Sequence, residues 1–309
     1  MISKSSNIFL AGHNGMVGSA IFNRLKKDGY KNIIVVSKKK LNLLDQKKVE
    51  KFFKKKKPKI VIIAAAKVGG ILANKNFKAN FIYENLTIQS NIIHSSYLSG
   101  VKNLIFLGSS CIYPKKTKQP IKENYFMTGT LEETNDAYAI AKIAGAKMCM
   151  EYSKQYKLNY KTLMPANMFG SNDNYDLKTS HFFPALIKKI HLAKISNKKT
   201  VTLWGNGKPK RELLYVEDFA DACVFFMRKK TKENLINIGS GVEKSIKEFA
   251  KYIMKKLNIN LKIKYDLSKP NGMQRKKLDL TIANKYGWKA KTKLDEAFKK
   301  VYLDYLKIK

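Results

Sequence analysis

Long apolar runs are missing from this chain of 309 residues. No stretch approaches the roughly 18 consecutive apolar residues of a membrane-spanning helix, and the first residues contain no signal-peptide core. Cysteine is sparse as well, and an odd count without metal-ligand spacing argues against a disulfide framework or a cysteine metal site. We therefore expect a cytoplasmic protein with no metal ion, in which Cys149 and Cys223 are small buried apolar residues.

Arginine is scarce although the chain is strongly basic. The 61 Lys and Arg residues exceed the 23 Asp and Glu residues by a net charge of +38. The lysines are spread along the whole sequence, often in short runs such as 54–57, whereas nucleic-acid sites favour arginine forks and interleaved aromatics. The charge indicates a compositional bias, and a basic module that binds nucleic acid is the remote alternative, which a salt titration of binding would identify. The four arginines are Arg24, Arg211, Arg228 and Arg275.

A glycine-rich loop follows the first apolar run, 7–11. Gly12, Gly15 and Gly18 recur at intervals of three, and apolar residues then recur at helical spacing in 20–25. A strand, a glycine loop and a helix form the context of the dinucleotide-binding fingerprint. The glycines let the backbone approach a pyrophosphate, and the helix N-terminus offers free N–H groups to it. An ordinary strand–helix turn is the alternative reading.

The second apolar run, 32–36, ends in Ser37 and three lysines, Lys38 to Lys40. In this kind of fold the end of the second strand meets the adenosine ribose, where an acidic residue selects NAD and cations accommodate a 2′-phosphate. Because no Asp or Glu stands there, the sequence favours NADP(H). A solvated lysine run is the alternative for any single one of these lysines.

Strands and helices alternate as far as residue 170. We predict further strands at 59–64, 104–108 and 160–164, a helix capped by Asp45 and another over 80–98. This alternation predicts an α/β fold with a Rossmann-type doubly wound parallel sheet. We expect 1–170 to form the NADP-binding domain, with return segments near 211–240, and 171–309 to form mainly a smaller α/β domain for the substrate.

Tyr138 and Lys142 lie four residues apart at the start of a helical pattern, so their side chains share one face. An ammonium beside a phenol favours the phenolate, and we therefore expect a lowered pKa for Tyr138. Ser109 follows the buried run 104–108 and can hold a carbonyl oxygen while the tyrosine protonates it. This is the chemistry that reduces a ketone with a hydride.

These features resemble the extended short-chain dehydrogenase/reductases that act on nucleotide sugars, and within them the GDP-L-fucose synthase family. The similarity runs over nearly the whole chain, and its most specific blocks are 12–21, 41–45, 65–71, 108–114, 180–181 and 204–212. The resemblance implies epimerisation of GDP-4-keto-6-deoxy-D-mannose at C3 and C5, followed by reduction at C4 with NADPH to give GDP-L-fucose. It also implies a homodimer formed through the helices that follow residues 80 and 138.

The resemblance assigns the epimerisation to Cys111 and His181. Residues two apart in extended chain point to one side, so we expect Cys111 beside Ser109, and its thiol can ionise near Lys142. His181 titrates near neutrality and is the natural partner acid. Arg211 is the expected diphosphate fork, and Trp204 is expected to pack in the nucleotide pocket.

The site residues that we predict fall into three groups. The catalytic group is Ser109, Cys111, Tyr138, Lys142 and His181. The cofactor-binding group is Gly12, His13, Asn14, Gly15, Met16, Val17, Gly18, Lys38, Asn42, Leu43, Leu107, Gly108, Ser109, Ser110, Lys142, Pro165, Ala166, Asn167, Met168 and His181. The substrate-binding group is Lys189, Trp204, Arg211, Asn271 and Lys276.

Four positions depart from the family pattern. Asn14, Lys38 and Lys189 stand where the family often has arginine, and Asn271 stands where an acidic residue is common. The first two bear on the preference for NADP, and the other two bear on substrate affinity. The alternative within enzymes is a related nucleotide-sugar epimerase or reductase that makes a different deoxysugar. A 4-epimerase needs no Cys/His pair, so the substitution Cys111→Ser distinguishes the two.

Overall fold

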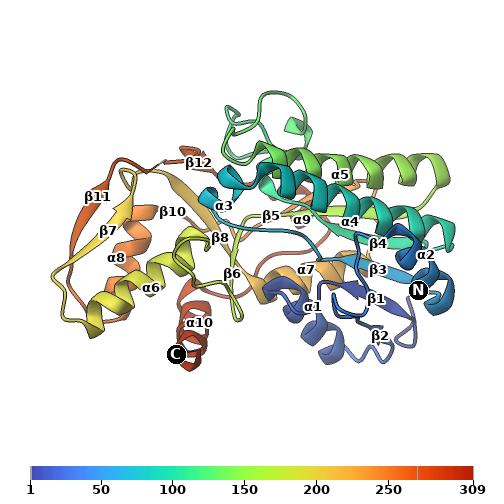
Figure 1. The fold of residues 1–309 in the computed structure, drawn as a ribbon, viewed down its shortest axis with the longest axis horizontal. Coiled ribbons are helices and arrows are strands. Elements are labelled where there is room, and N and C mark those ends of the chain that lie inside the picture. The colour runs from blue at the N-terminus through green and yellow to red at the C-terminus, as the bar shows by residue number, and fades with distance from the viewer. Residues whose placement is uncertain (1, 270, 309) are drawn as a thin grey trace.

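The computed structural model describes residues 2–269 and 271–308. A six-stranded sheet forms one half of the molecule, with strand order β2-β1-β3-β4-β5-β9 and every neighbouring pair parallel. Its strands are β1 Ile8–Ala11, β2 Ile33–Ile34, β3 Ile60–Ile63, β4 Asn103–Leu107, β5 Asn159–Pro165 and β9 Leu235–Ile238. The predicted doubly wound parallel sheet is confirmed (Figure 1).

Helices cover both faces of this sheet. They are α1 Met16–Lys27, α2 Gln46–Lys56, α4 Lys78–Leu98, α5 Asp136–Tyr156 and α7 Val216–Arg228, while the short helix α3 Ile71–Asn76 packs against α4. Successive side chains of a strand point to opposite faces, so Ile8 and Leu10 pack with α1 and α7, whereas Phe9 and Ala11 pack with α2 and α4. Within the described ranges, none of the helices is both long and apolar enough to cross a bilayer.

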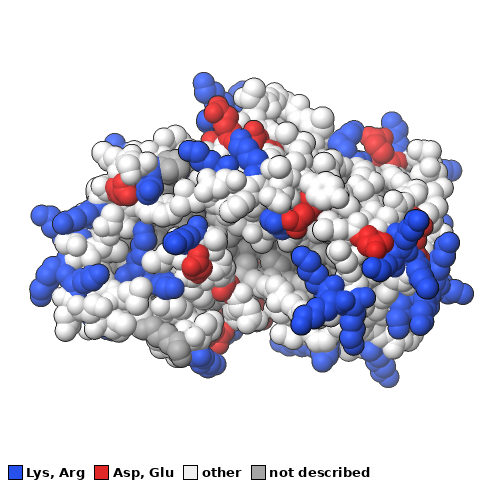
Figure 2. Space-filling model, in the orientation of Figure 1, with Lys and Arg blue, Asp and Glu red and all other residues white. Residues whose placement is uncertain are grey.

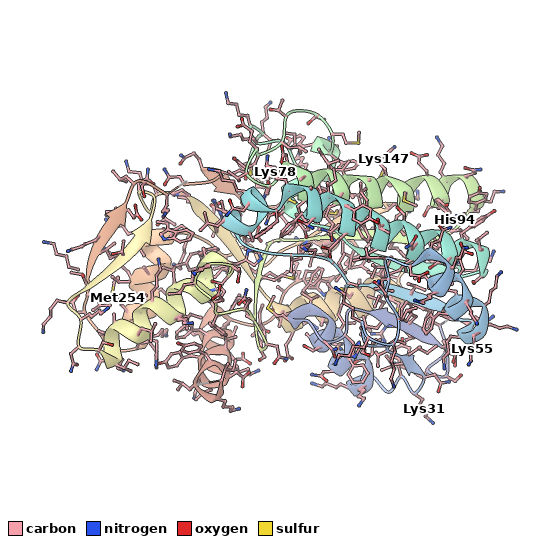
Figure 3. All side chains as sticks on the ribbon, in the orientation of Figure 1. Lys31, Lys55, Lys78, His94, Lys147 and Met254 are labelled. Atoms are coloured by element: carbon pink, nitrogen blue, oxygen red, sulfur yellow. The ribbon has the colours of Figure 1, made fainter. Side chains whose placement is uncertain are left out.

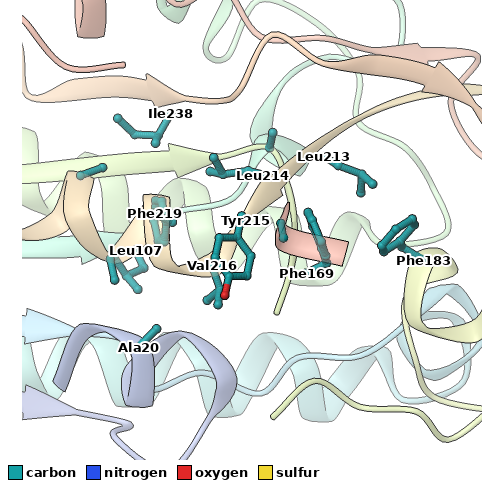
Figure 4. Packing of buried hydrophobic residues seen from close by; sticks show 14 of the residues in the cluster. Ala20, Leu107, Phe169, Phe183, Leu213, Leu214, Tyr215, Val216, Phe219 and Ile238 are labelled. Atoms are coloured by element: carbon teal, nitrogen blue, oxygen red, sulfur yellow. The ribbon is translucent and has the colours of Figure 1, made fainter. Parts of the chain in front are cut away.

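The other half is built from short strands and three helices. These are β6 Asn167–Phe169, β7 Thr200–Trp204, β8 Lys210–Tyr215, β10 Glu243–Ser245, β11 Lys262–Asp266 and β12 Arg275–Lys276, with α6 Phe182–Ile195, α8 Ile246–Lys256 and α10 Leu294–Lys307. The chain between them returns to the large sheet, where α9 Thr281–Lys285 packs against β9. One apolar cluster continues from the large sheet into this half, and Figure 4 shows Leu107 and Ile238 on one side of it and Phe183 on the other. The two halves therefore share a core.

Local sequence signals explain several boundaries. Asp45 accepts a hydrogen bond from the backbone of Lys48 and caps α2, as predicted. The predicted strand 32–36 is mostly unpaired, because only Ile33 and Ile34 bond to β1 at this edge of the sheet. Cys149 and Cys223 are buried in the apolar clusters, as predicted.

The segment after β4 differs from the expected extended chain. Ser109 is extended, but residues Ser110–Ile112 form a 3₁₀ turn that the Ser109 hydroxyl caps by accepting from the Cys111 backbone N–H at 3.3 Å. Cys111 is therefore brought beside Ser109 by a turn rather than by strand alternation. The sequence Ser-Ser-Cys offers this local side-chain-to-backbone bond in place of a strand ladder.

A buried polar network holds this turn to the end of β9. The Tyr113 hydroxyl donates to Asn237 Oδ1 at 2.6 Å, and Asn237 Nδ2 donates to the Ile121 carbonyl at 2.9 Å. The backbone N–H of Asn237 donates to a Glu123 carboxylate oxygen at 2.9 Å. Because each partner is buried, the network fixes the chain that carries Cys111 relative to the sheet.

We predict that Tyr113→Phe lowers the free energy of unfolding by about 1–3 kcal/mol, because it leaves Asn237 Oδ1 buried without a donor. Urea unfolding followed by circular dichroism measures this loss. Tyr265→Phe is the matched control, since Tyr265 is exposed and is expected to change stability by less than about 0.5 kcal/mol. Equal stabilities for Tyr113→Phe and the parent would contradict the role of the network.

Candidate active site

A cleft of about 920 Å³ lies at the carboxyl edge of the six-stranded sheet. Its walls come from the loops that follow β1, β3, β4 and β5 and, opposite them, from residues around β7, β8 and β12. Figure 2 shows the molecule hollowed between its two halves. Ligands of open parallel sheets bind at this edge, so the cleft is the candidate site.

The cleft brings together nearly all of the predicted site residues. Those in its wall are Gly12, His13, Asn14, Gly15, Met16, Val17, Gly18, Lys38, Asn42, Leu43, Gly108, Ser109, Ser110, Cys111, Tyr138, Pro165, Ala166, Asn167, Met168, His181, Lys189, Trp204, Arg211, Asn271 and Lys276. Leu107 and Lys142 lie directly behind the wall, where they bond to each other.

The glycine loop fits a dinucleotide. Gly12 has a φ of +87°, and a Cβ added there would lie 2.5 Å from the Ala65 backbone nitrogen. A Cβ on Gly18 would lie 2.0 Å from the Gly12 carbonyl oxygen, so α1 packs directly against the loop. Gly15 begins α1 without a side-chain cap, which leaves the first N–H groups of the helix for a ligand. This cradle suits the pyrophosphate of a dinucleotide cofactor.

The end of the second strand also faces the cleft. All three lysines of the run are exposed, and Lys38 is the one of them that lies in the cleft wall. The next loop is held by side chains: Asn42 Oδ1 accepts from the Leu44 backbone at 3.2 Å, and Asn91 of α4 donates to the Leu43 carbonyl at 2.9 Å. Lys38 is therefore the lysine of this run that we assign to the cofactor phosphate.

Lys142 is anchored to strand β4. Its ammonium donates to the Leu107 carbonyl at 2.8 Å and lies 4.7 Å from the centre of the Phe106 ring. The same ammonium lies 5.8 Å from the centre of the Tyr138 ring, one helical turn away. Burial lowers the pKa of Lys142 to about 8, since the charged form loses its hydration.

The expected lowering of the Tyr138 pKa is wrong for the cleft as it stands. Burial raises the pKa of Tyr138, and the nearby Cys111 raises it further, while a hydrogen bond with Ser109 acts in the opposite direction. The physical reason is that loss of hydration penalises the phenolate, and the Lys142 ammonium is directed at the Leu107 carbonyl. Tyr138 is thus a protonated phenol beside Ser109, which suits a proton donor to a carbonyl oxygen.

Cys111 and His181 reach the same cleft from opposite halves. Cys111 lies in the turn after β4, and His181 is the residue that precedes α6. Burial raises the pKa of the Cys111 thiol, so the expected thiolate is not the resting form, although Lys276 acts to lower it. Burial and then Lys276 lower the pKa of His181, which favours neutral imidazole. The resting cleft therefore holds a protonated thiol and an imidazole that can accept a proton.

Arg211 differs from the other arginines. Arg24 and Arg228 pair with Asp28, and Arg275 pairs with Glu243. Arg211 instead donates to the carbonyls of the loop before β12, with Met273 at 2.6 Å, and keeps its charge in the cleft. Burial lowers its pKa to about 10. A planar fork held by backbone carbonyls is suited to a diphosphate.

The outer end of the cleft carries an aromatic wall. The Lys189 ammonium lies 5.2 Å from the centre of the Trp204 ring and donates to the Thr202 carbonyl at 3.1 Å. Asn271 Oδ1 accepts from the Asn206 backbone N–H at 2.8 Å, so its amide NH₂ is the group left for a ligand. This wall can stack a nucleobase, with cations and an amide donor around it.

Several cleft residues escaped the sequence analysis. Six buried side-chain oxygens of the described chain have no hydrogen-bond partner, and four of them belong to residues that line the cleft: Asn74, Asn135, Asp173 and Ser180. Buried polar atoms normally have a hydrogen-bond partner, so the four unpartnered oxygens in the cleft indicate a surface to which a polar ligand can bind. Glu132 and the Lys67–Glu84 ion pair also lie in the wall. Ser180 and Lys67 lie within the blocks 180–181 and 65–71 of the resemblance, which assigns them no role, and no motif or periodicity in the sequence singles out the others.

The lysines outside the cleft are distributed over the surface. Figure 2 shows them over both halves of this face, and Figure 3 labels Lys31 and Lys55 at the end near α2, with Lys147 on α5. Lys147 pairs with Glu151 one helical turn away. A distribution of this kind agrees with a compositional bias rather than a single binding stripe.

We predict that wild-type protein becomes more stable relative to Lys142→Met as the pH rises. Since burial lowers the pKa of Lys142 to about 8 from 10.5, the unfolded chain holds more protons than the folded one between these values. The free energy of unfolding of wild type, relative to that of Lys142→Met, therefore increases by about 2 kcal/mol between about pH 7.5 and about pH 10.

Urea unfolding of both proteins at these two pH values, without cofactor, measures the effect. Lys147→Met, on the same helix but exposed, is the control, and its difference from wild type should stay constant. A difference for Lys142→Met that does not change with pH would contradict the burial of a charged ammonium at this position.

Comparison with known proteins agrees with the geometry. Residues 8–239 match the NAD dependent epimerase/dehydratase family. The chain is 46% identical to GDP-L-fucose synthase 1 of Arabidopsis thaliana, over 99% of this chain and 95% of that protein, and 43% identical to the GDP-L-fucose synthase of Escherichia coli, over 97% and 96%. The NADP-bound structure of a GDP-L-fucose synthetase from Naegleria fowleri superimposes with a TM-score of 0.89 at 28% identity, over 99% of this chain and 94% of that one. This chain belongs to the NAD dependent epimerase/dehydratase family.

Proposed function

We propose that this protein converts GDP-4-keto-6-deoxy-D-mannose into GDP-L-fucose, in two epimerisations and one reduction that depends on NADPH. The observation that carries the proposal is the meeting of Ser109, Cys111, Tyr138 and His181 in one cleft that also contains the glycine loop 12–18. The identity of more than two fifths to GDP-L-fucose synthases over nearly the full chain supports it. The enzyme is thus an oxidoreductase and an isomerase with a single site.

The C4 carbonyl of the substrate makes both neighbouring carbons acidic. Hydrogens at C3 and C5 are released more easily when the developing negative charge on the C4 oxygen is stabilised. Tyr138 and Ser109, which hydrogen-bond to each other, supply two O–H groups at one point of the cleft. The same pair serves both the enolate of the epimerisation and the alkoxide of the reduction.

Cys111 and His181 exchange the protons at C3 and C5. Transfer of the thiol proton to the imidazole produces a thiolate base and an imidazolium acid without a change in the total proton count. The thiolate removes the hydrogen from one face of the carbon, and the imidazolium returns a proton to the other face. Burial of both groups makes this separated charge costly, so it forms only in the course of the reaction.

NADPH supplies the hydride for C4 when it is bound. We assign its pyrophosphate to the glycine loop 12–18 and its 2′-phosphate to Lys38. Tyr138 gives its proton to the C4 oxygen, and Lys142, which its bond to Leu107 holds behind the tyrosine, carries the positive charge that favours this step. Arg211 holds the diphosphate of the substrate, and Trp204 packs on its nucleobase, with Lys189, Asn271 and Lys276 as further contacts.

We assign residues 1–170 and the returning strand β9 to the cofactor, and most of residues 171–309 to the substrate. Both parts contribute residues to the wall of the cleft between them. We further propose that two copies pair through α4 and α5, whose surface exposes Tyr83 and Ile140. Such apolar side chains on neighbouring helices suit burial against a second copy.

We predict that incubation of GDP-4-keto-6-deoxy-D-mannose with NADPH in D₂O gives GDP-L-fucose that carries deuterium at C3 and C5, as read by NMR, and that NADH gives a lower rate. Cys111→Ser should reduce product formation by at least about 100-fold, because it removes the base. Cys149→Ala, which changes a cysteine outside the cleft, is the control. Full-rate fucose formation by Cys111→Ser would contradict the assignment, and a different deoxysugar as product would favour the related reductases.

We predict that Ile140→Asp converts the protein from a dimer to a monomer of 35.3 kDa, because it places a charge in an interface that excludes water. Sedimentation velocity measures the mass. Leu303→Asp on α10 is the matched control, since Leu303 is also exposed. A wild-type protein that sediments as a monomer, or a dimer that survives Ile140→Asp, would contradict pairing through α4 and α5.

A further inference from the structure

Lys276 is placed in the cleft by a strand that is bonded on both sides. β12 pairs with β8 in the register Lys276 with Arg211. Its neighbour Arg275 pairs with Glu243 at 2.8 Å and is half exposed, so the alternation of the strand turns Lys276 inward to the cleft wall. The side chain of Gln119 holds the other edge by accepting from the Lys277 backbone N–H at 2.9 Å.

The chain just beyond Lys276 is held by a buried carboxylate. Glu212 accepts from the Leu278 backbone N–H at 2.9 Å and from the Gly241 backbone N–H at 2.7 Å. The Ile121 backbone N–H donates to the Lys277 carbonyl at 2.8 Å. Residue 276 is therefore fixed to the segment that follows Cys111, with little freedom of its backbone.

The groups that face Lys276 explain which ligand its charge serves. Burial lowers the pKa of Lys276, whereas a Cys111 thiolate and then Glu132 act to raise it, and Arg211 repels the ammonium. Glu132 is buried in the wall, and its nearest cationic partner, Lys115, lies at 3.6 Å. Within the described chain, no hydrogen bond or ion pair engages the Lys276 ammonium, so its charge is available to the cleft.

The groups that face Cys111 also indicate an interaction between its sulfur and Lys276. Lys276 is the strongest of the groups that favour its charged form, ahead of Ser109 and Lys142, and Tyr138 is the remaining titratable neighbour. The Lys142 ammonium is already bonded to the Leu107 carbonyl. Lys276 therefore provides the charge that the sequence analysis had assigned to Lys142.

We propose that Lys276 is the positioning cation that stabilises the thiolate of Cys111 during the epimerisation, in addition to its assigned contact with the substrate. The Lys276 ammonium affects the epimerisation through the effect of its charge on the Cys111 sulfur and does not itself transfer a proton. The same charge disfavours an imidazolium at His181, so the imidazole is neutral in the resting cleft. Glu132 opposes the lowering of the Lys276 pKa that burial causes. This inference rests on the proposed role of Cys111 in the epimerisation.

The test measures the rate at which iodoacetamide alkylates Cys111 as a function of pH, in full-length protein without substrate, by mass spectrometry of the Cys111 peptide. The thiolate is the reacting form, so the curve reports its formation. We expect the curve of Lys276→Met to shift upward by about one pH unit, which makes alkylation about tenfold slower at neutral pH. Lys276→Arg should remain close to wild type, because the charge is kept.

Two controls separate charge from packing. Lys277→Met removes the next lysine along the chain, just after β12, and should leave the curve in place. Lys276→Gln is a second neutral variant, and the fold of each variant is checked by its circular dichroism spectrum and its NADPH affinity, which should match those of wild type. A Lys276→Met curve that superimposes on the wild-type curve would overturn the proposal, and so would an equal shift in Lys276→Arg. Because no substrate is present, the result stands even if the product of the enzyme is another deoxysugar.

Discussion

One hydrogen bond joins the two parts of the sequence on which the chemistry depends. The Lys142 ammonium on α5 donates to the carbonyl of Leu107 at the end of β4, across 35 positions of the chain. It holds Tyr138, one turn earlier on the helix, over the turn that contains Ser109 and Cys111. The cost is a charge buried in the core, which the pKa of about 8 records. This buried bond fixes the Tyr138 phenol where it can donate to the carbonyl oxygen of a substrate.

Buried carboxylates and amides, rather than charge pairs, hold the backbone on both sides of the cleft. Glu212 binds two backbone N–H groups and holds the strand of Lys276, and Asn237 ties the turn after Cys111 to β9. Such fully bonded groups set positions to within a fraction of an ångström, as proton transfer between fixed partners requires. The cations of the cleft wall, Arg211 and Lys276, then interact with the reacting groups with little screening by solvent.

The sequence alone predicted the elements whose signals are local. The glycine spacing of 12–18, the cap at Asp45 and the apolar runs of the strands each depend on neighbours in the chain, and the structure contains them. The resemblance to a family placed Cys111 and His181 in one site, which no spacing could show, since they lie 70 positions apart. The short pairing of 33–34 depends on the position of that strand at an edge of the sheet.

The charges of the site could not be predicted in the same way. The lowered pKa that we expected for Tyr138 assumed that a nearby ammonium decides it, but burial has the larger effect. The degree of burial of Tyr138 follows from the tertiary packing, and the four-residue spacing of Tyr138 and Lys142 does not predict it. The same holds for Asn74, Asn135 and Ser180, whose unpartnered oxygens become visible only when the two halves meet.

The central claim is that one oxygen-binding point, formed by Tyr138 and Ser109, serves both the epimerisation and the reduction. The most direct measurement compares two rates in Tyr138→Phe: the exchange of hydrogens at C3 and C5 of the substrate with D₂O, and the transfer of hydride from NADPH. The account predicts that both rates fall together, by about 100-fold or more, because both steps place negative charge on the same oxygen. Exchange at the wild-type rate in a variant that no longer transfers hydride would contradict it.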